Sequence, residues 1–154
     1  MALDALLPQV LTSLFREIVD GPPGDMAFVV DPNDPGLIKS LAALPAEKAS
    51  ARRDGRPSIA GHVQHLRFGL TLLNKWATGD QNAFAEASFS ESWSHQTVSE
   101  DEWRTLRQEF EEQARQWQAQ LESPREWDAM TLSGFMSSVA HTAYHMGAIR
   151  QLVK

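Results

Sequence analysis

Two histidines near the end of the chain, His141 and His145, are spaced so that they could hold one metal ion between them. They occur in SSVAHTAYHMGAIRQ, residues 137–151, and four residues is close to one helical turn, so both imidazoles project from the same side of a helix. With a third histidine from a neighbouring helix they would offer three nitrogen ligands at about 2.0–2.1 Å and leave a position for water or substrate. Such ligation suits zinc, nickel, iron or copper, and the metal would generate a hydroxide or thiolate nucleophile near neutral pH.

A second pair of histidines, His62 and His65, strengthens this interpretation. Two histidines at this spacing alone are a weak signal, because they also occur on solvated or interface faces. Four of the five histidines, however, fall on two expected helices, and only His95 lies in an expected loop. Imidazoles between packed helices are costly unless something satisfies their nitrogens, which a metal ion does well. The motif HTAYH has Thr142 where a zinc metalloprotease of the H-E-x-x-H type has Glu, so that class is excluded.

Small residues share the helical face of His141 and His145. They are Gly134, Ser138 and Ala148, and we expect them to leave room for a pocket above the metal. Among the five tryptophans, Trp93 is the one candidate for a pocket wall, although pinning of the core is the favoured role for it as well. The others are expected in the core, because aromatic side chains usually serve burial.

Apolar residues at spacings of three and four predict four main helices. They cover about 3–19, 58–78, 99–121 and 132–152, with a short helix at 37–44 that ends before Pro45 and a long connection between Gly79 and Val98. Ser58 is the expected N-cap of the second helix, and SEDEW, residues 99–103, predicts a capping box at the third. Pro8 suggests that the first helix begins near it. The pattern predicts an all-α four-helix bundle that forms one domain over residues 1–154.

Composition excludes several classes of function. The chain carries 14 Lys and Arg against 20 Asp and Glu, which disfavours nucleic acid as a partner. Cysteine is absent, so neither a disulfide framework nor a thiolate metal site is possible. There is no basic leader and no uncharged run of about 20 residues, so we expect a cytoplasmic protein without a membrane span. One basic cluster, EKASARRDGRP at residues 47–57, fits a solvated loop better than an anion site.

SIAGHVQHL, residues 58–66, followed by HTAYHMGAIRQ, residues 141–151, resembles the DinB-like, or YfiT-like, metal-binding superfamily. The resemblance covers nearly the whole chain, and the terminal motif is its specific part. It implies a four-helix bundle that binds a divalent metal, zinc or nickel, through His65, His141 and His145. His62 matches no general ligand position, which leaves it as a group behind the ligands, a substrate contact or an alternative ligand.

The resemblance also implies a function and an assembly. Relatives are often homodimers, and they include bacillithiol S-transferases and a mycothiol-dependent maleylpyruvate isomerase, in which the metal would activate the thiol of the cofactor. We therefore expect a metal-dependent thiol S-transferase or hydrolase that acts on a small-molecule substrate with a low-molecular-weight thiol. The alternative is a bundle that binds a metal or small ligand without turnover. Several relatives carry an acidic residue where this chain has Gly69, so the resemblance does not extend to carboxylate-assisted chemistry.

Overall fold

A computed structural model describes residues 3–154, with side chains from residue 5 onward. Within these residues the chain is all-helical and contains no strand, which confirms the expected fold class. Its elements are α1 (Leu3–Asp20), α2 (Gly36–Ala42), α3 (Ala46–Ser50), α4 (Ile59–Ala77), the 3₁₀ turn η1 (Glu91–Trp93), α5 (Glu100–Glu122) and α6 (Ala129–Val153). No helix among the described residues combines the length and apolar character needed to cross a membrane.

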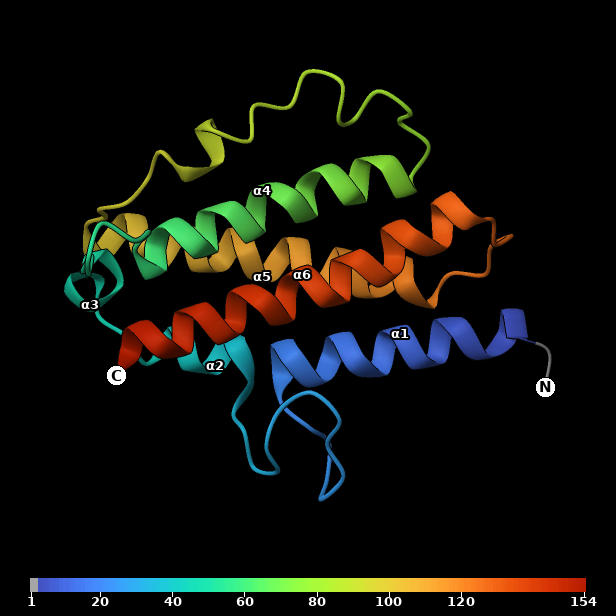
Figure 1. Cartoon of the computed structure of the whole chain (residues 1–154), viewed down its shortest axis with the longest axis horizontal. Helices are drawn as coiled ribbons and strands as arrows, with labels where there is room; N and C mark the ends of the chain where they lie inside the picture. The colour runs from blue at the N-terminus through green and yellow to red at the C-terminus, as the bar shows by residue number, and fades with distance from the viewer. Residues whose placement is uncertain (1–2) are drawn as a thin grey trace.

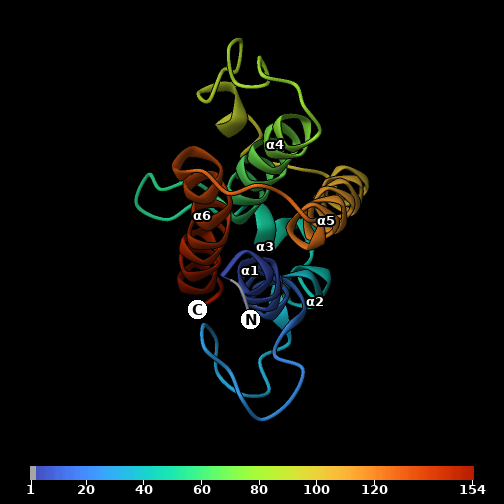
Figure 2. The same ribbon diagram turned by 90° about the vertical axis from the view of Figure 1, so that its right-hand side faces the viewer.

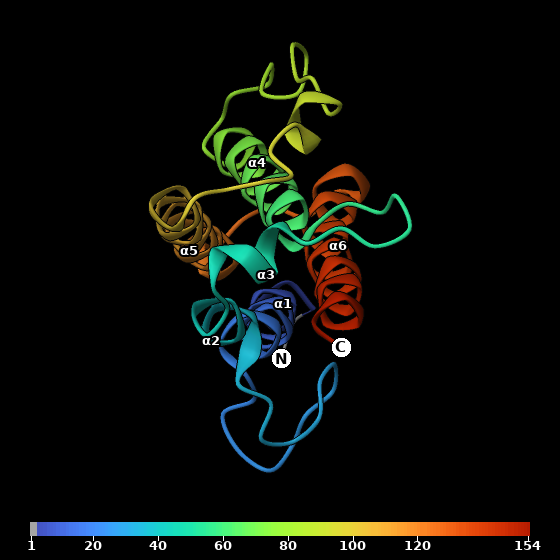
Figure 3. The ribbon, with the colours of Figure 1, turned by 90° about the vertical axis from the view of Figure 1, so that its left-hand side faces the viewer.

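The four long helices pack side by side into a bundle. Each contacts two neighbours, so that α5 lies between α1 and α4 and α6 closes the ring between α4 and α1 (Figures 2 and 3). Figure 1 shows that α1 and α6 run in one direction and α4 and α5 in the other. The two short helices, α2 and α3, lie at one end of the bundle.

The direction of the helices explains the long connection after α4. Because α4 and α5 are consecutive and parallel, the chain must return along the length of the bundle between them. It does so over the outside of α4 (Figure 1), and η1 contacts that helix on the way. The connection is irregular except for this 3₁₀ turn, as the sequence predicts.

Side-chain caps set the starts of the helices that carry the candidate site. The hydroxyl of Ser58 accepts from the backbone N–H of Gly61 at 3.0 Å, which confirms the predicted N-cap of α4. The predicted capping box of α5 is also present. In contrast, α6 begins at Ala129, three residues before its expected start, because Asp128 accepts from the backbone N–H of Thr131 at 2.7 Å.

Two other expectations are corrected at the N-terminal half. The first helix extends to Leu3, with Pro8 inside it, and its buried side is centred on Leu11, Phe15 and Ile18, while Val10 is about half exposed. Pro45 does not merely end a helix but forms the N-cap of α3, because its fixed φ suits a helix start. The segment 46–50, expected in the basic loop, is therefore helical.

Buried tryptophans anchor the core, as the sequence predicts for Trp103 and Trp117. Both are fully buried. The indole N–H of Trp103 donates to the carbonyl of Leu44 at 2.7 Å, and that of Trp117 donates to the hydroxyl of Ser138 at 2.8 Å. Their polar atoms are thus satisfied, which is the condition for burying tryptophan at little cost.

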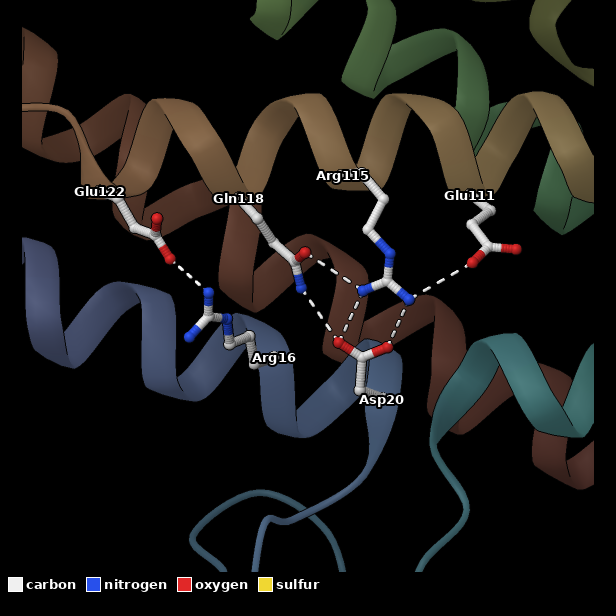
Figure 4. A network of polar contacts seen from close by, with 6 residues as sticks. All are labelled: Arg16, Asp20, Glu111, Arg115, Gln118 and Glu122. Atoms are coloured by element: carbon white, nitrogen blue, oxygen red, sulfur yellow. Dashed lines mark hydrogen bonds and ion pairs between the residues drawn. The ribbon is translucent and has the colours of Figure 1, made fainter.

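A polar network joins α1 to α5 on the side of the bundle shown in Figure 4. Both oxygens of Asp20 accept from Arg115 at 2.7 Å, and Gln118 donates to the same carboxylate at 3.1 Å. Arg16 pairs with Glu122 one turn of α1 earlier. Burial opposes ionisation of Asp20, but the hydrogen bonds from Arg115 and Gln118 outweigh it and lower the pKa of this carboxyl. The network fixes the register of the two helices.

Candidate metal centre

Helices α4 and α6 bring together the three histidines that the sequence singled out. His65 comes from α4, and His141 and His145 come from one face of α6. Their Nε2 atoms face one another: that of His141 lies 3.2 Å from His65 Nε2 and 3.0 Å from His145 Nε2. His65 and His145 are buried, whereas His141 is more open. The three ligand atoms lie within 4.8 Å of one another.

The separations between these nitrogens fit a metal ion. Around a tetrahedral zinc with bonds of about 2.0–2.1 Å, neighbouring ligand atoms are about 3.3 Å apart. The observed 3.0 and 3.2 Å are only slightly shorter. The donor set consists of imidazoles, which suits zinc or nickel better than magnesium or calcium. His65, His141 and His145 could therefore hold a transition metal with small adjustments of their rings.

His62, the fourth histidine, lies behind the ligands and not among them. Its Nδ1 is 2.9 Å from Nδ1 of His145, the ring nitrogen that does not face His141. Only 7% of the surface of His62 is exposed. The sequence left three roles open for His62. This geometry favours that of a group behind the metal ligands, in contact with His145, over that of a metal ligand itself.

Ser92 is a site residue that the sequence analysis missed. Nδ1 of His65 lies 2.7 Å from the hydroxyl oxygen of Ser92, and that hydroxyl donates to the carbonyl of Phe89 at 2.6 Å. Ser92 is buried although it belongs to a polar connection. No local pattern marks it, because its position depends on where the connection crosses α4.

Trp93 covers the histidines from the same 3₁₀ turn. Its ring stacks on His65, with centroids 4.2 Å apart and planes 15° from parallel, and it meets His62 edge-on at 5.3 Å. It also lies 5.7 Å from the ring of His145. The sequence favours pinning of the core as the role of Trp93, but its contacts place it against the histidine cluster.

Gln96 fastens this turn to the start of α4. Its side-chain oxygen accepts from the backbone N–H of Ser58 at 2.7 Å, and its amide nitrogen donates to the carbonyl of Trp93 at 2.6 Å. The hydroxyl of Ser58 donates to the carbonyl of Gln96 at 2.6 Å. The Gln96 side chain lies directly over Gly61, where an added methyl carbon would come within 2.5 Å of its amide group. Gly61 therefore makes room for the contact that holds the turn in place.

The environment keeps the ligands neutral. Burial, reinforced by His141 and His62, lowers the pKa of His65 to about 4, and burial together with the other three histidines lowers the pKa of His145 to about 3. Burial also lowers the pKa values of His62 and His141. Neutral imidazole is the form that binds metal, so protons compete weakly for this site at neutral pH.

The room near the ligands is not where the sequence analysis expected it. A methyl carbon on Gly134 would lie 2.7 Å from the ring of Trp76, and the hydroxyl of Ser138 is used by Trp117. Gly134 and Ser138 therefore permit close packing and do not form a pocket. Gly69, in contrast, has room for an added methyl carbon, which would meet only Cε1 of His141, at the ordinary contact distance of 3.9 Å.

The remaining candidates stay apart from this centre. His95 is exposed in the connection and contacts its neighbour Ser94. In the basic cluster, Arg52 donates to the carbonyls of Gly55 and Arg56 and is exposed, as expected of a solvated loop.

Comparisons of this chain with family models, curated proteins and solved structures find no match.

Proposed function

We propose that this protein binds one divalent metal ion, zinc or nickel, through Nε2 of His65, His141 and His145. The observation that carries the proposal is the convergence of these three atoms, at 3.2 and 3.0 Å, in a buried cluster of neutral imidazoles. When bound, the metal would supply Lewis acidity that turns a thiol or water into a nucleophile near neutral pH.

The protein residues around the ligands have distinct tasks in this proposal. Trp93 shields His65 from water by stacking on it, while the more open His141 and the space at Gly69 give a small molecule access to the centre. The substrate is then a small electrophile, and the co-substrate is a low-molecular-weight thiol. The function is a metal-dependent thiol S-transferase, with hydrolysis as the variant in which water replaces the thiol.

We further propose that the chain is a member of the DinB-like superfamily. The quoted motifs support this assignment, and so does the arrangement of two parallel helix pairs running in opposite directions, linked by a long return after the second long helix. The thiol in the proposed reaction rests on this family assignment rather than on a contact in the site.

The outer face of α6 supports a homodimer as part of the same proposal. It presents Met136, Ala140, Tyr144 and Gly147, all exposed and uncharged, beside His141. An uncharged exposed face on a long helix is typical of a contact between subunits. We expect a dimer by light scattering on a sizing column, and we expect Ala140→Asp to shift it to monomer without unfolding the chain.

Metal content is the first test. Elemental mass spectrometry on tag-free protein should find close to one zinc or nickel per chain, and His65→Ala and His141→Ala should abolish it. The matched control is His95→Ala, which removes a histidine outside the cluster and should leave the metal content unchanged. Wild-type protein that is free of metal and takes up no added zinc or nickel would overturn the proposal.

A cobalt-substituted protein distinguishes the enzyme from the alternative, a bundle that binds metal without turnover. Thiols such as mycothiol, bacillithiol or glutathione should alter the visible spectrum of bound cobalt. The protein should then accelerate the reaction in which the thiol displaces chloride from an electrophile such as monochlorobimane. A stable cobalt site whose spectrum no thiol changes would favour the non-catalytic alternative.

A further inference from the structure

We propose that His62 and Ser92 are positioning residues, which hold His145 and His65 in the tautomer that presents Nε2 to a metal. The inference rests on the proposed function, because it assigns a role in that same site. It concerns two side chains that are not ligands and that belong to different parts of the fold, α4 and η1.

The hydroxyl proton of Ser92 determines which nitrogen of His65 carries a proton. A serine hydroxyl has one hydrogen to donate, and that of Ser92 goes to the carbonyl of Phe89 at 2.6 Å. Its oxygen must therefore accept the hydrogen bond that joins it to His65, so the proton of this neutral ring is on Nδ1. Nε2 of His65 is then left with its lone pair, facing His141.

The two ring nitrogens of His145 face different histidines. Nε2 of His145 faces His141, and Nδ1 faces Nδ1 of His62 at 2.9 Å. One of these two Nδ1 atoms donates and the other accepts. If His145 uses Nε2 as a ligand, its proton is on Nδ1, and His62 accepts it there while keeping its own proton on Nε2. His62 therefore faces Nδ1 of His145, whereas a metal would bind at Nε2, so His62 cannot bind the same metal ion.

Both acceptors are themselves held in place. Ser92 is 1% exposed, and the turn that carries it is fastened to the start of α4 through Gln96. His62 is 7% exposed and is flanked by the edge of Trp93 at 5.3 Å. The fold therefore sets the Nδ1–H tautomer of His65 before a metal binds, and it places His62 where it can accept from Nδ1 of His145. Loss of such partners behind a metal ligand typically lowers metal affinity by about 10- to 100-fold.

Zinc affinity of matched variants tests each residue separately. His62→Leu and Ser92→Ala remove the acceptors, and each should weaken zinc binding about 10- to 100-fold in competition with a chelator. His62→Asn keeps an acceptor near the position of Nδ1 and should bind zinc within a few-fold of wild type. Ser90→Ala, which removes an exposed hydroxyl in the same connection, is the control for Ser92. An unchanged affinity in His62→Leu or Ser92→Ala would overturn the role of that residue.

Nitrogen-15 NMR of the histidine rings in metal-free protein provides a second readout that needs no variant to bind metal. In wild type, His65 and His145 should both be Nδ1–H tautomers, and in His62→Leu the proton of His145 should move to Nε2. Nε2–H tautomers of both rings in wild type would overturn the inference. A wild type that binds no zinc would instead overturn the proposed function, and the tautomers would still decide the inference.

Discussion

The glycines inside α4 and α6 give a sharp test of where the site has room, because the structure predicts opposite responses at two of them. At Gly69, an added methyl carbon meets only Cε1 of His141, at the ordinary contact distance of 3.9 Å. At Gly134, it would lie 2.7 Å from one carbon of the Trp76 ring and 2.9 Å from another. Gly69→Ala and Gly134→Ala are therefore the same chemical change in two different surroundings.

The expected magnitudes follow from these contacts. Alanine is favoured over glycine in a helix interior by about 1 kcal/mol, and Gly69→Ala should realise most of this gain. For a chain of 154 residues, 1 kcal/mol corresponds to a rise in Tm of about 2–4 °C. At Gly134 the same gain is opposed by overpacking, which costs about 1–3 kcal/mol, because Trp76 also packs against Phe135 at 5.9 Å. Gly134→Ala should be neutral or destabilised by up to about 2 kcal/mol.

Thermal and urea unfolding of the metal-free protein, followed by circular dichroism, measures both changes. A companion variant, Gly69→Leu, tests the functional meaning of the space. It should keep bound cobalt, since no ligand is changed, but lose the spectral response to added thiol, since leucine would fill the space beside His141. Destabilisation of Gly69→Ala as large as that of Gly134→Ala would refute the packing argument, and an intact thiol response in Gly69→Leu would refute access from this side.

Three further changes test other parts of the structure. Gly61→Ala should lower zinc affinity although it changes no metal ligand, because the added methyl group displaces Gln96 and loosens η1. Competition with a chelator measures the affinity, and an unchanged value would contradict this role of Gly61. Lowering the pH from about 6.5 to 4 should destabilise the metal-free protein, because the pKa values of His65 and His145, about 4 and about 3, lie below their ordinary 6.5, so in that range these two rings take up protons mainly in the unfolded chain. Urea titrations at several pH values should show that the free energy of unfolding falls by up to about 1.4 kcal/mol per pH unit for each histidine. The fall should be smaller in His145→Gln, and a free energy that does not change with pH would be inconsistent with the burial of His65 and His145. Glu17→Gln should lower the free energy of unfolding by about 1–3 kcal/mol, because the buried carboxylate accepts hydrogen bonds from three backbone N–H groups of the loop after α1. An unchanged urea midpoint would refute this role of Glu17.

The features that sequence reasoning predicted are those that depend on neighbours along the chain. The N-cap at Ser58 and the capping box at Ser99 are local hydrogen bonds, and both were found where the sequence placed them. The i, i+4 spacing of His141 and His145 fixed their common face for the same reason. The predicted start of α6 near Leu132 is three residues late, although Asp128 satisfies the same local rule for an N-cap.

The features that were missed depend on contacts far apart in the chain. Ser92 meets His65 only because the connection after α4 crosses back over that helix, and nothing near Ser92 in the sequence indicates this. Gly134 and Ser138 share a face with the ligands, but whether a small residue leaves a cavity depends on what the opposite helix places there. Here Trp76 and Trp117 occupy the space.

The charge of the site bears on which nucleophile the proposed centre would favour. Among the described residues, the hydrogen-bond and ring partners of the histidine cluster are neutral, namely the Ser92 hydroxyl, the indole of Trp93 and the phenol ring of Tyr144. None of the described carboxylates hydrogen-bonds to any of the four rings. A side chain at position 69 would lie next to His141, but the residue there is glycine, so this position contributes no carboxylate. A divalent ion held by three neutral imidazoles keeps its full charge of +2 in a site of low polarity, where charge acts most strongly. Such a centre stabilises an anionic fourth ligand, and it contains no carboxylate positioned as a general base for water. Water has a pKa of about 15.7 and a thiol one of about 8.5, so a thiol bound to the same ion would release its proton to solvent more readily, and the surroundings favour thiol transfer over hydrolysis.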